Sequence, residues 1–407
     1  MVSAVVISGR EDLTRNTSAV IDIIRRHGPV SRKQIAELTG LSPAALTNIV
    51  GNLIDQGLVH EVGLDVSSGG RKPILLQLNP DAGFVVGVDI GSVNLRVGVT
   101  DLAGKALAFN QEKSEAESGS QGLFDRVIHK IQVTIKDSGI DDGRIKGIGI
   151  GISAVVHPQT GVCLFCRNMP GWEGLAVRKM FTERLKKEVL IDDSMRTMAL
   201  AEKRFGKGRG VDNMIHICLG NGVGAGIFIE GKMYRGSWGV AGELGHITVD
   251  ENGPLCRCGN RGCLESLVSG RAIVQRALIY LQEGVSSSIY AAVNGDLEKV
   301  TPEIIAEAAR KGDKVAHNIM NETGEHLGIG IANAVNLFNP ELVVIGGGLA
   351  GAADLLLEPV TRTVKARGLQ VAADSLKIEV SELGQKAGVL GAASLVLDEL
   401  FKPISGR

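Results

Sequence analysis

A short stretch near residue 250 concentrates the residues that most restrict how this chain can fold. One imidazole and three thiols fall within 18 positions, a density typical of a metal-binding loop. The four side chains are those of His246, Cys256, Cys258 and Cys263. Gly259 and Gly262, between the last two cysteines, allow the backbone to turn tightly around an ion. The set predicts a closed, four-coordinate zinc site with three cysteines and one histidine.

The same ligands indicate what the metal would do. Three thiolates and an imidazole leave no position for a catalytic water, so we expect a structural Zn2+ ion. The alternative is a cluster of disulfides, which is typical of secreted proteins. The segment from Met1 to Asn16 lacks the pattern of a secretory signal, and we therefore expect a cytoplasmic location with reduced thiols. Cys163 and Cys166 form a separate Cys-x-x-Cys pair in apolar surroundings and are expected to be small buried residues rather than a redox pair.

Two acids flank the predicted metal loop. Glu243 precedes His246 by three residues, and Glu265 follows Cys263 by two. The ligand spacing is not that of a zinc finger or ribbon, so the metal alone does not name a function. A loop that fixes two carboxylates and an imidazole in one place is interpreted as the wall of a polar ligand site.

Length and composition limit the classes of protein that the chain can belong to. A chain of 407 residues is too long for one core, so we expect two or three domains. The net charge of −1 provides no general attraction to nucleic acid or to a membrane. Aromatic residues make up only 3% of the chain, which argues against a platform that stacks single-stranded bases. No apolar run reaches membrane length, so no membrane insertion is expected.

Residues 1–79 are predicted to form a winged helix-turn-helix domain. Thr17 or Ser18 is the expected cap of a first amphipathic helix. Ser31 is the expected N-cap of a second helix, and Ser42 of a third that has proline at its first position. Two short alternating strands follow, over 59–63 and 74–78, and the loop between them forms the wing.

Two kinds of side chain in this domain suit DNA. Short side chains near the start of the third helix can reach base edges in a major groove, and cations on the second helix and wing can reach phosphates. The predicted DNA contacts are Arg32, Lys33, Ser42, Ala44, Ala45, Thr47, Asn48, Arg71 and Lys72. The alternative is a helical protein-interaction module, which the small net charge of +1 over residues 1–79 favours slightly. The placement of the cations favours DNA.

Beyond residue 83 the sequence contains an internal repeat of glycine-turned hairpins, each followed by a helix and a strand. The two copies predict a first lobe over 84–190 and a second over 191–407, with the C-terminal helix free to pack back on the first. The glycine-rich turns at 89–92 and 220–224 can point backbone N–H groups at an anion, although hairpin geometry explains them nearly as well.

Several motifs together resemble the ROK family, whose name covers repressors, open reading frames and sugar kinases. They are Ala241–His246, Cys256–Glu265, Asn168–Trp172 and the wing sequence Gly70–Pro73. The resemblance spans almost the whole chain. It implies an α/β fold in which the winged helix-turn-helix precedes a duplicated, actin-like, hexokinase-type pair of lobes.

The resemblance also implies a sugar site. The family's sugar contacts correspond here to Asn168, Asp193, Glu243, His246 and Glu265. The catalytic base of the family's kinases falls on Asp193.

Most departures from the kinase pattern fall on the nucleotide side, and one, at Asp192, removes an amide donor to the sugar. The first phosphate turn of the kinases reads Asp-x-Gly-Gly-Thr, and Val93 here replaces the threonine and cannot donate a hydrogen bond to phosphate. Asn221 replaces the threonine of the second turn, Gly-Thr-Gly. Asp192 replaces an asparagine, which removes an amide donor and places two acids together. We therefore expect a degenerate ATP site, with Asp193 a vestigial base and no catalytic residues.

These observations predict a sugar-responsive transcriptional repressor. Its expected partners are double-stranded operator DNA, a sugar or sugar-phosphate effector and a second copy of the chain in a homodimer or tetramer. A regulatory protein partner is also possible. The main alternative is an ATP-dependent sugar kinase that carries a DNA-binding domain, and a third is a scaffold controlled by a protein with no small ligand.

Overall fold

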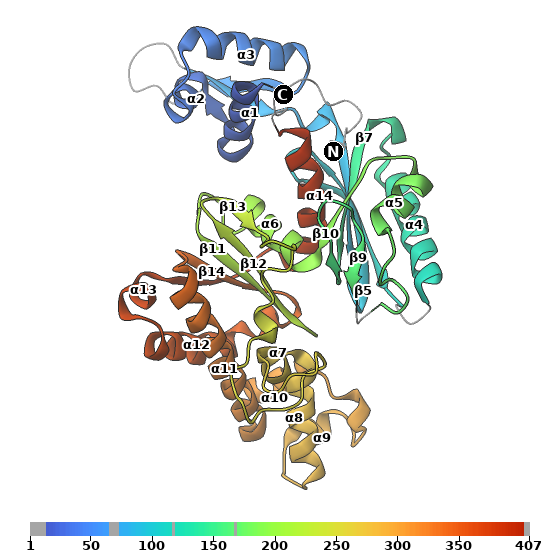
Figure 1. Ribbon diagram of the computed structural model, residues 1–407, viewed down its shortest axis with the longest axis vertical. Coiled ribbons are helices and arrows are strands. Elements are labelled where there is room, and N and C mark those ends of the chain that lie inside the picture. Colours follow the sequence, from blue (N-terminus) through green and yellow to red (C-terminus); the bar gives the residue numbers. More distant parts are fainter. Residues whose placement is uncertain (1–13, 65–72, 116–118, 167–168, 403–407) are drawn as a thin grey trace. The chain divides into compact units, whose positions relative to one another are not determined.

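The computed structural model describes residues 14–64, 73–115, 119–166 and 169–402 (Figure 1). The chain forms two compact units, Met1–Thr197 with Lys386–Arg407, and Met198–Gln385. The sequence placed the division between the lobes after residue 190, and the units divide seven residues later. No helix in the described ranges is long and apolar enough to cross a membrane.

The first unit begins with the winged helix-turn-helix. Its elements are α1 (Arg15–His27), β1 (Val30–Ser31), α2 (Arg32–Thr39), α3 (Pro43–Asp55), β2 (Val59–Leu64) and β3 (Ile74–Leu78). The three strands form an antiparallel sheet in the order β1-β3-β2. Fully buried side chains from all three helices and from β3 make its core, among them Ile21, Ile35, Leu46 and Leu76.

Local capping explains where these helices begin. Ser31 caps α2 in a capping box with Gln34, and the Ser42 side chain accepts the N–H of Ala45 ahead of α3, as predicted. The prediction for α1 was wrong. Its cap is Thr14, whose hydroxyl accepts the N–H of Thr17, so the helix begins about one turn earlier than expected.

The remainder of the first unit is built on a five-stranded sheet in the order β10-β7-β4-β5-β6. Its elements are β4 (Phe84–Ile90), β5 (Asn94–Asp101), β6 (Ala106–Lys113), α4 (Gly119–Ser138), β7 (Ile145–Ile152), β8 (Val155–Val156), β9 (Cys163–Phe165), α5 (Val177–Leu185), β10 (Val189–Asp193), the start of α6 (Ser194–Phe205) and α14 (Ala387–Leu400). Strands β4, β5 and β6 are antiparallel, whereas β7 and β10 run parallel to β4.

The C-terminal helix α14 packs directly on β4 and β7 of this sheet. Glycines make the close approach possible. A Cβ on Gly87 would lie 2.1 Å from the carbonyl oxygen of Val389, and one on Gly149 would lie 1.8 Å from that of Ala392. The last helix of the chain is therefore part of the first unit.

The second unit repeats this arrangement. Its sheet has the order β13-β12-β11-β14-β15, so both sheets place their strands in the same sequence, third-second-first-fourth-fifth. Its elements are β11 (Met214–Leu219), β12 (Val223–Ile229), β13 (Lys232–Tyr234), α7 (Leu264–Val268), α8 (Gly270–Gln282), α9 (Ser288–Ala292), α10 (Pro302–Arg310), α11 (Lys314–Phe338), β14 (Leu342–Gly346), α12 (Ala353–Arg367), α13 (Gln370–Ser375) and β15 (Lys377–Val380). The predicted duplication is confirmed.

Helices α11 and α12 pack against each other in the second unit (Figure 1). Gly324 and Gly328 of α11 face α12, where a Cβ would lie 2.4 Å from Pro359 and 2.6 Å from Thr363. Small residues at this contact bring the two helices close together.

Candidate metal centre, ligand site and DNA-binding surface

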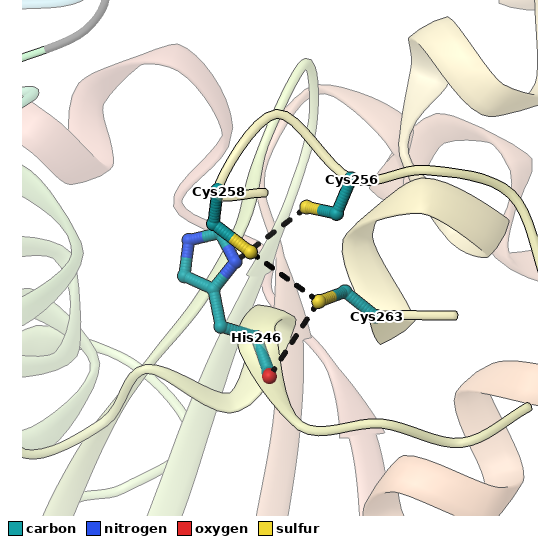
Figure 2. A group of neighbouring side chains, drawn as sticks. All are labelled: His246, Cys256, Cys258 and Cys263. Atoms are coloured by element: carbon teal, nitrogen blue, oxygen red, sulfur yellow. Dashed lines mark hydrogen bonds between the residues drawn. The ribbon is translucent and has the colours of Figure 1, made fainter. Parts of the chain in front are cut away.

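The four predicted metal ligands gather at one point of the second unit (Figure 2). Their ligand atoms all lie within 4.8 Å of one another. The Sγ atoms of Cys258 and Cys263 are 3.5 Å apart, and Cys256 Sγ lies 3.8 Å from Nδ1 of His246. Zinc–sulfur bonds of about 2.3 Å in a tetrahedron place sulfurs about 3.8 Å apart, so this geometry fits the ion.

Glycine conformations hold the loop that carries the cysteines. Gly262 has φ +62°, and a Cβ there would lie 1.5 Å from the carbonyl oxygen of Asp250. Gly259 has φ +93°, and it lies in a turn closed by the N–H of Cys256 donating to the carbonyl of Asn260 at 2.7 Å. Both positions therefore require glycine, as the sequence indicated.

Protonation of the thiols bears on metal binding. Burial and the neighbouring thiols raise the pKa of Cys263 to about 12, and burial raises the pKa of Cys256. None of the six cysteines forms a disulfide. Since zinc binds thiolate, an ion would have to displace the protons of these thiols.

The separate pair of Cys163 and Cys166 lies in the first unit. Cys163 is buried, as predicted, whereas Cys166 is half-buried. A hydrogen bond with Cys166 and burial raise the pKa of Cys163.

Glu243 lies beside the cluster of His246 and the three cysteines. Its Oε2 is 3.9 Å from Nε2 of His246, whereas Nδ1 of the same ring faces Cys256. His246 lies in a 3-10 turn, Leu244–His246, which directly follows Glu243. Gly242 fixes this position, because its carbonyl accepts the N–H of Ala225 on β12 and it has no room for a side chain. The exposed Glu243 carboxylate is therefore held next to the imidazole by a rigid backbone.

Glu265 lies on α7, which begins directly after the ligand Cys263. Its Oε2 accepts the backbone N–H of Val223 at 2.9 Å, at the end of the second glycine-rich turn. The other end of that turn is also fixed, because the carbonyl of Gly220 accepts the N–H of Gly270 at 2.8 Å. The N–H of Gly220 is donated to Gly222 within the turn. The metal loop thus supports the turn that was predicted to face an anion.

The other predicted sugar contacts belong to the first unit. Asp193 ends β10, and its Oδ1 accepts the N–H of Met195 at 2.7 Å as α6 begins. The neighbouring Asp192 is buried and accepts a hydrogen bond from Nε of Arg196 at 2.8 Å. The two adjacent acids predicted from the sequence are therefore balanced by a buried cation. Asn168, the remaining predicted contact, lies outside the described residues.

The first glycine-rich turn is closed by its own backbone. The N–H of Gly91 donates to the carbonyl of Asn94 at 3.0 Å, and the side chain of Val93 is 39% exposed. Asp89 lies in β4 rather than in the turn, and Nη1 of Arg96 donates to its Oδ2 at 3.0 Å. Burial raises the pKa of Asp89, and Arg96 opposes that shift. This acid is thus paired with a cation from the next strand.

The predicted DNA-contacting surface is presented by α2 and α3. Ala44, Thr47 and Asn48 are exposed, and Ala45 is half-buried. The hydroxyl of Thr47 donates to the carbonyl of Pro43 at 2.8 Å, which leaves its methyl group and its lone pairs for other contacts.

The predicted cations differ in their surroundings. Arg32 pairs with Glu61 of β2 at 3.2 Å, and Lys33 lies 3.9 Å from Glu37. Both ion pairs involve exposed or half-exposed side chains and are weak enough to exchange for phosphate. The wing cations Arg71 and Lys72 lie outside the described residues.

Comparison with known proteins places the chain in a family. The model of the ROK family matches residues 85–399, and that of the MarR family matches residues 11–65. The chain belongs to the ROK family. The match covers both sheets and the metal loop, and the MarR match lies on the winged helix-turn-helix.

Two curated ROK relatives match nearly end to end. The xylose repressor of Caldicellulosiruptor bescii is 33% identical over 386 residues, covering 95% of this chain and 96% of the relative. The DNA-binding transcriptional dual regulator NagC of Escherichia coli (strain K12) is 33% identical over 390 residues, covering 95% and 94%.

Two solved ROK structures match this chain over different lengths. A ROK family transcriptional regulator described as a homologue of the E. coli MLC protein has a TM-score of 0.79 and 30% identity, covering 95% of this chain and 96% of its own. A ROK family glucokinase from Streptomyces griseus, solved with glucose and AMPPNP, has a TM-score of 0.68 and 31% identity. It covers 99% of its own chain but 77% of this one.

Two functional relationships were not predicted from the sequence. The hydrogen bond between Glu265 and Val223 joins residues 42 positions apart, and no local pattern indicates it. The pair of Asp192 and Arg196 had a visible signal, because the two residues are four positions apart at the start of a helix.

Proposed function

We propose that this ROK protein is a sugar-responsive transcriptional repressor. One observation carries the proposal: the matches to a named repressor and to a named transcriptional regulator run through the winged helix-turn-helix and both five-stranded sheets, and each covers 95% of the chain. The glucokinase match covers only 77%. A chain with the kinase lobes and an added DNA-binding domain joins a ligand-binding part to an operator-binding part, which is the organisation that a ligand-controlled repressor needs.

The sugar site that we propose uses Glu243, His246 and Glu265 of the second unit. Sugar hydroxyls need fixed acceptors and donors, and carboxylates supply strong acceptors. Glu243 and Glu265 are held at defined positions beside the Cys3His cluster. Nε2 of His246 faces Glu243 and away from the cysteines, so it can serve a ligand while Nδ1 serves a metal.

The metal that we propose is a structural zinc ion held by His246, Cys256, Cys258 and Cys263. The separations of the ligand atoms and the all-protein set of four support it. Its contribution is to fix the loop between Glu243 and Glu265. Glu243 beside the imidazole also has the placement of a carboxylate that orients a metal-bound histidine.

We further propose that the chain transfers no phosphate from ATP. Val93 offers no hydroxyl at the first turn, and the backbone N–H of Gly91 is already donated to Asn94. Asp89 is engaged by Arg96. The second candidate function, a sugar kinase, is supported by the fold shared with the S. griseus glucokinase, and an ATP-turnover assay separates the two.

Operator binding by a repressor of this kind favours a homodimer or a higher oligomer. A two-fold dimer would present two copies of α3 to an inverted repeat, with half-sites about one or a few helical turns apart. We also propose that a regulatory protein partner can control DNA binding by the same winged helix-turn-helix.

A thermal-shift screen tests the proposal. The full-length protein is screened against free hexoses, pentoses, amino sugars and their phosphates, each with and without Mg-ATP. We expect stabilisation by one sugar class that does not require ATP, because binding to the folded state raises its melting temperature. Stabilisation by no sugar would contradict the sugar site, and stabilisation only in the presence of ATP would favour the kinase.

A further inference from the structure

Helix α3 carries exposed side chains on one face along most of its length. Leu46, Val50 and Leu53 form its buried stripe. At 100° per residue the opposite side carries Asn48 and Asn52, which are four positions apart and both exposed. The two amides therefore point in nearly the same direction, about 6 Å apart along the helix axis.

The side chains of Asn48 and Asn52 make no hydrogen bond within the described part of the chain. This distinguishes them from neighbouring polar residues. Thr47 donates its hydroxyl to the carbonyl of Pro43, and Ser42 uses its oxygen to cap the helix. An exposed amide with both its donor and acceptor available is suited to a partner that offers both.

The surface between the two amides is open. Gly51 lies on the same face, and a Cβ built there would meet no atom within 4 Å. A helix without a side chain at this point can approach another surface closely. Asp55, the last residue of α3, has an exposed carboxylate that would repel DNA phosphates. The part of α3 that enters a DNA groove would therefore end just after Asn52.

We propose that Asn48 and Asn52 together read two adenines in the major groove of the operator half-site. Adenine presents an N7 acceptor beside an N6 donor, which an asparagine amide can bind at once. The separation of about 6 Å along α3 corresponds to about two base-pair steps of about 3.4 Å. The proposal rests on operator binding by α3, as proposed above, and adds Asn52 and the identity of the bases.

The test uses DNA selected by the full-length protein from a random duplex library. Each adenine of the enriched half-site is replaced in turn by 7-deazaadenine, which pairs normally but lacks the N7 acceptor. We expect two adenines, about two steps apart, at which this change weakens binding by about five- to tenfold. In Asn52→Ala, one of the two positions should become insensitive, with less than about a twofold further loss. Asn48→Ala should do the same at the other.

Asn318→Ala is the control, because this exposed asparagine lies on α11 (Lys314–Phe338) in the other unit and is no part of the winged helix-turn-helix. It should retain both 7-deazaadenine penalties. Penalties that persist unchanged in Asn52→Ala, or a half-site without sensitive adenines, would overturn the proposal while leaving operator binding intact. Failure to enrich any sequence would instead overturn the DNA-binding function on which the proposal rests.

Discussion

The carboxylate of Glu265 accepts the backbone N–H of Val223, with 2.9 Å between Oε2 and N. Glu265 stands two residues after the proposed metal ligand Cys263, and Val223 ends the second glycine-rich turn. A residue expected to contact sugar therefore also fixes a turn that in a kinase would face phosphate. The loop that carries the cysteines, the carboxylate of Glu265 and the second glycine-rich turn are therefore joined by direct contacts within the second unit.

Removing this carboxylate should expose the Val223 amide. Hydrogen bonds to charged groups contribute about 1.5–3 kcal/mol, so Glu265→Ala should speed exchange of this N–H by about 10- to 100-fold. Hydrogen exchange followed by NMR or by fragment mass spectrometry measures it. Glu251→Ala, which removes an exposed acid from the same loop, should leave the exchange rate unchanged. Equal protection in Glu265→Ala would show that the contact does not hold the turn.

Zinc should be present at about one ion per chain in protein purified without chelators. Elemental analysis measures the content, and Cys258→Ser should lower both the content and the melting temperature. Structural zinc stabilises small domains by on the order of 10 kcal/mol, and a fold with its own core should depend on it less. Cys166→Ser, outside the cluster, should keep the metal. Metal-free protein with unchanged stability would rule out the zinc site.

Glu243 should be needed for sugar affinity. We expect Glu243→Ala to weaken binding of the stabilising sugar by about 10- to 100-fold, because a charged acceptor is lost. Isothermal titration calorimetry measures the affinity, with Glu251→Ala again as the control. Because Glu243 is exposed and its backbone is held by Gly242, the variant should fold normally. Undiminished affinity in a folded variant would place the sugar elsewhere.

His216 should make stability fall in mild acid. Burial lowers the pKa of this histidine to about 4, whereas the unfolded value is about 6.5. Between these values the unfolded chain binds a proton that the folded chain does not, so the free energy of unfolding decreases as pH falls. The slope should approach about 1.4 kcal/mol per pH unit and total about 3 kcal/mol.

The contribution of His216 is isolated by comparing variants. Burial raises the pKa of Glu202, and this raised pKa makes the free energy of unfolding increase as pH falls, opposite to the effect of His216. The free energy of unfolding in urea is therefore measured at pH 7 and pH 5 for the wild type and for His216→Gln, and the two changes are compared. His317→Gln, at an exposed position on α11, should behave as the wild type. The same pH dependence in His216→Gln would mean that His216 does not titrate in this range.

The wing cations should strengthen binding to all DNA sequences alike. Arg71→Ala and Lys72→Ala should each lower the salt dependence of binding by about 0.9 in the log–log slope, since each phosphate contact releases counterions. Fluorescence anisotropy at several salt concentrations gives the slope, and Lys232→Ala, on β13, is the control. An unchanged slope in both wing variants would remove the wing from the interface.

The parts of the fold that local chemistry determines could be predicted from the sequence. Ser31 and Ser42 cap their helices as expected, because the capping signal lies within four residues. The metal cluster was equally visible, since its ligands lie in one short stretch and the glycines between them suit only a tight loop. The internal duplication could be predicted because similar glycine-rich turns recur along the chain, whereas the order of the strands came from the structure.

Relationships that depend on tertiary placement could not be read in the same way. Asp89 and Arg96 are directly paired across β4 and β5, and this register depends on Asp89 lying within the strand rather than in the turn that the sequence predicted. The contact of Glu265 with Val223 depends on the position of α7 beside β12. Asp193 and Glu243 were assigned through the resemblance to ROK kinases, and no sequence pattern relates them to each other.

The most direct test of the account measures operator affinity while the stabilising sugar is titrated, alongside a coupled assay for ATP turnover. We predict that saturating sugar changes operator affinity by about 5- to 150-fold, the usual range for coupling between two sites. The change should be lost in Glu243→Ala, and no sugar-dependent ATP turnover should occur. Operator affinity that does not change with sugar concentration, together with sugar-dependent ATP turnover that Asp193→Asn abolishes, would contradict the account and identify a kinase.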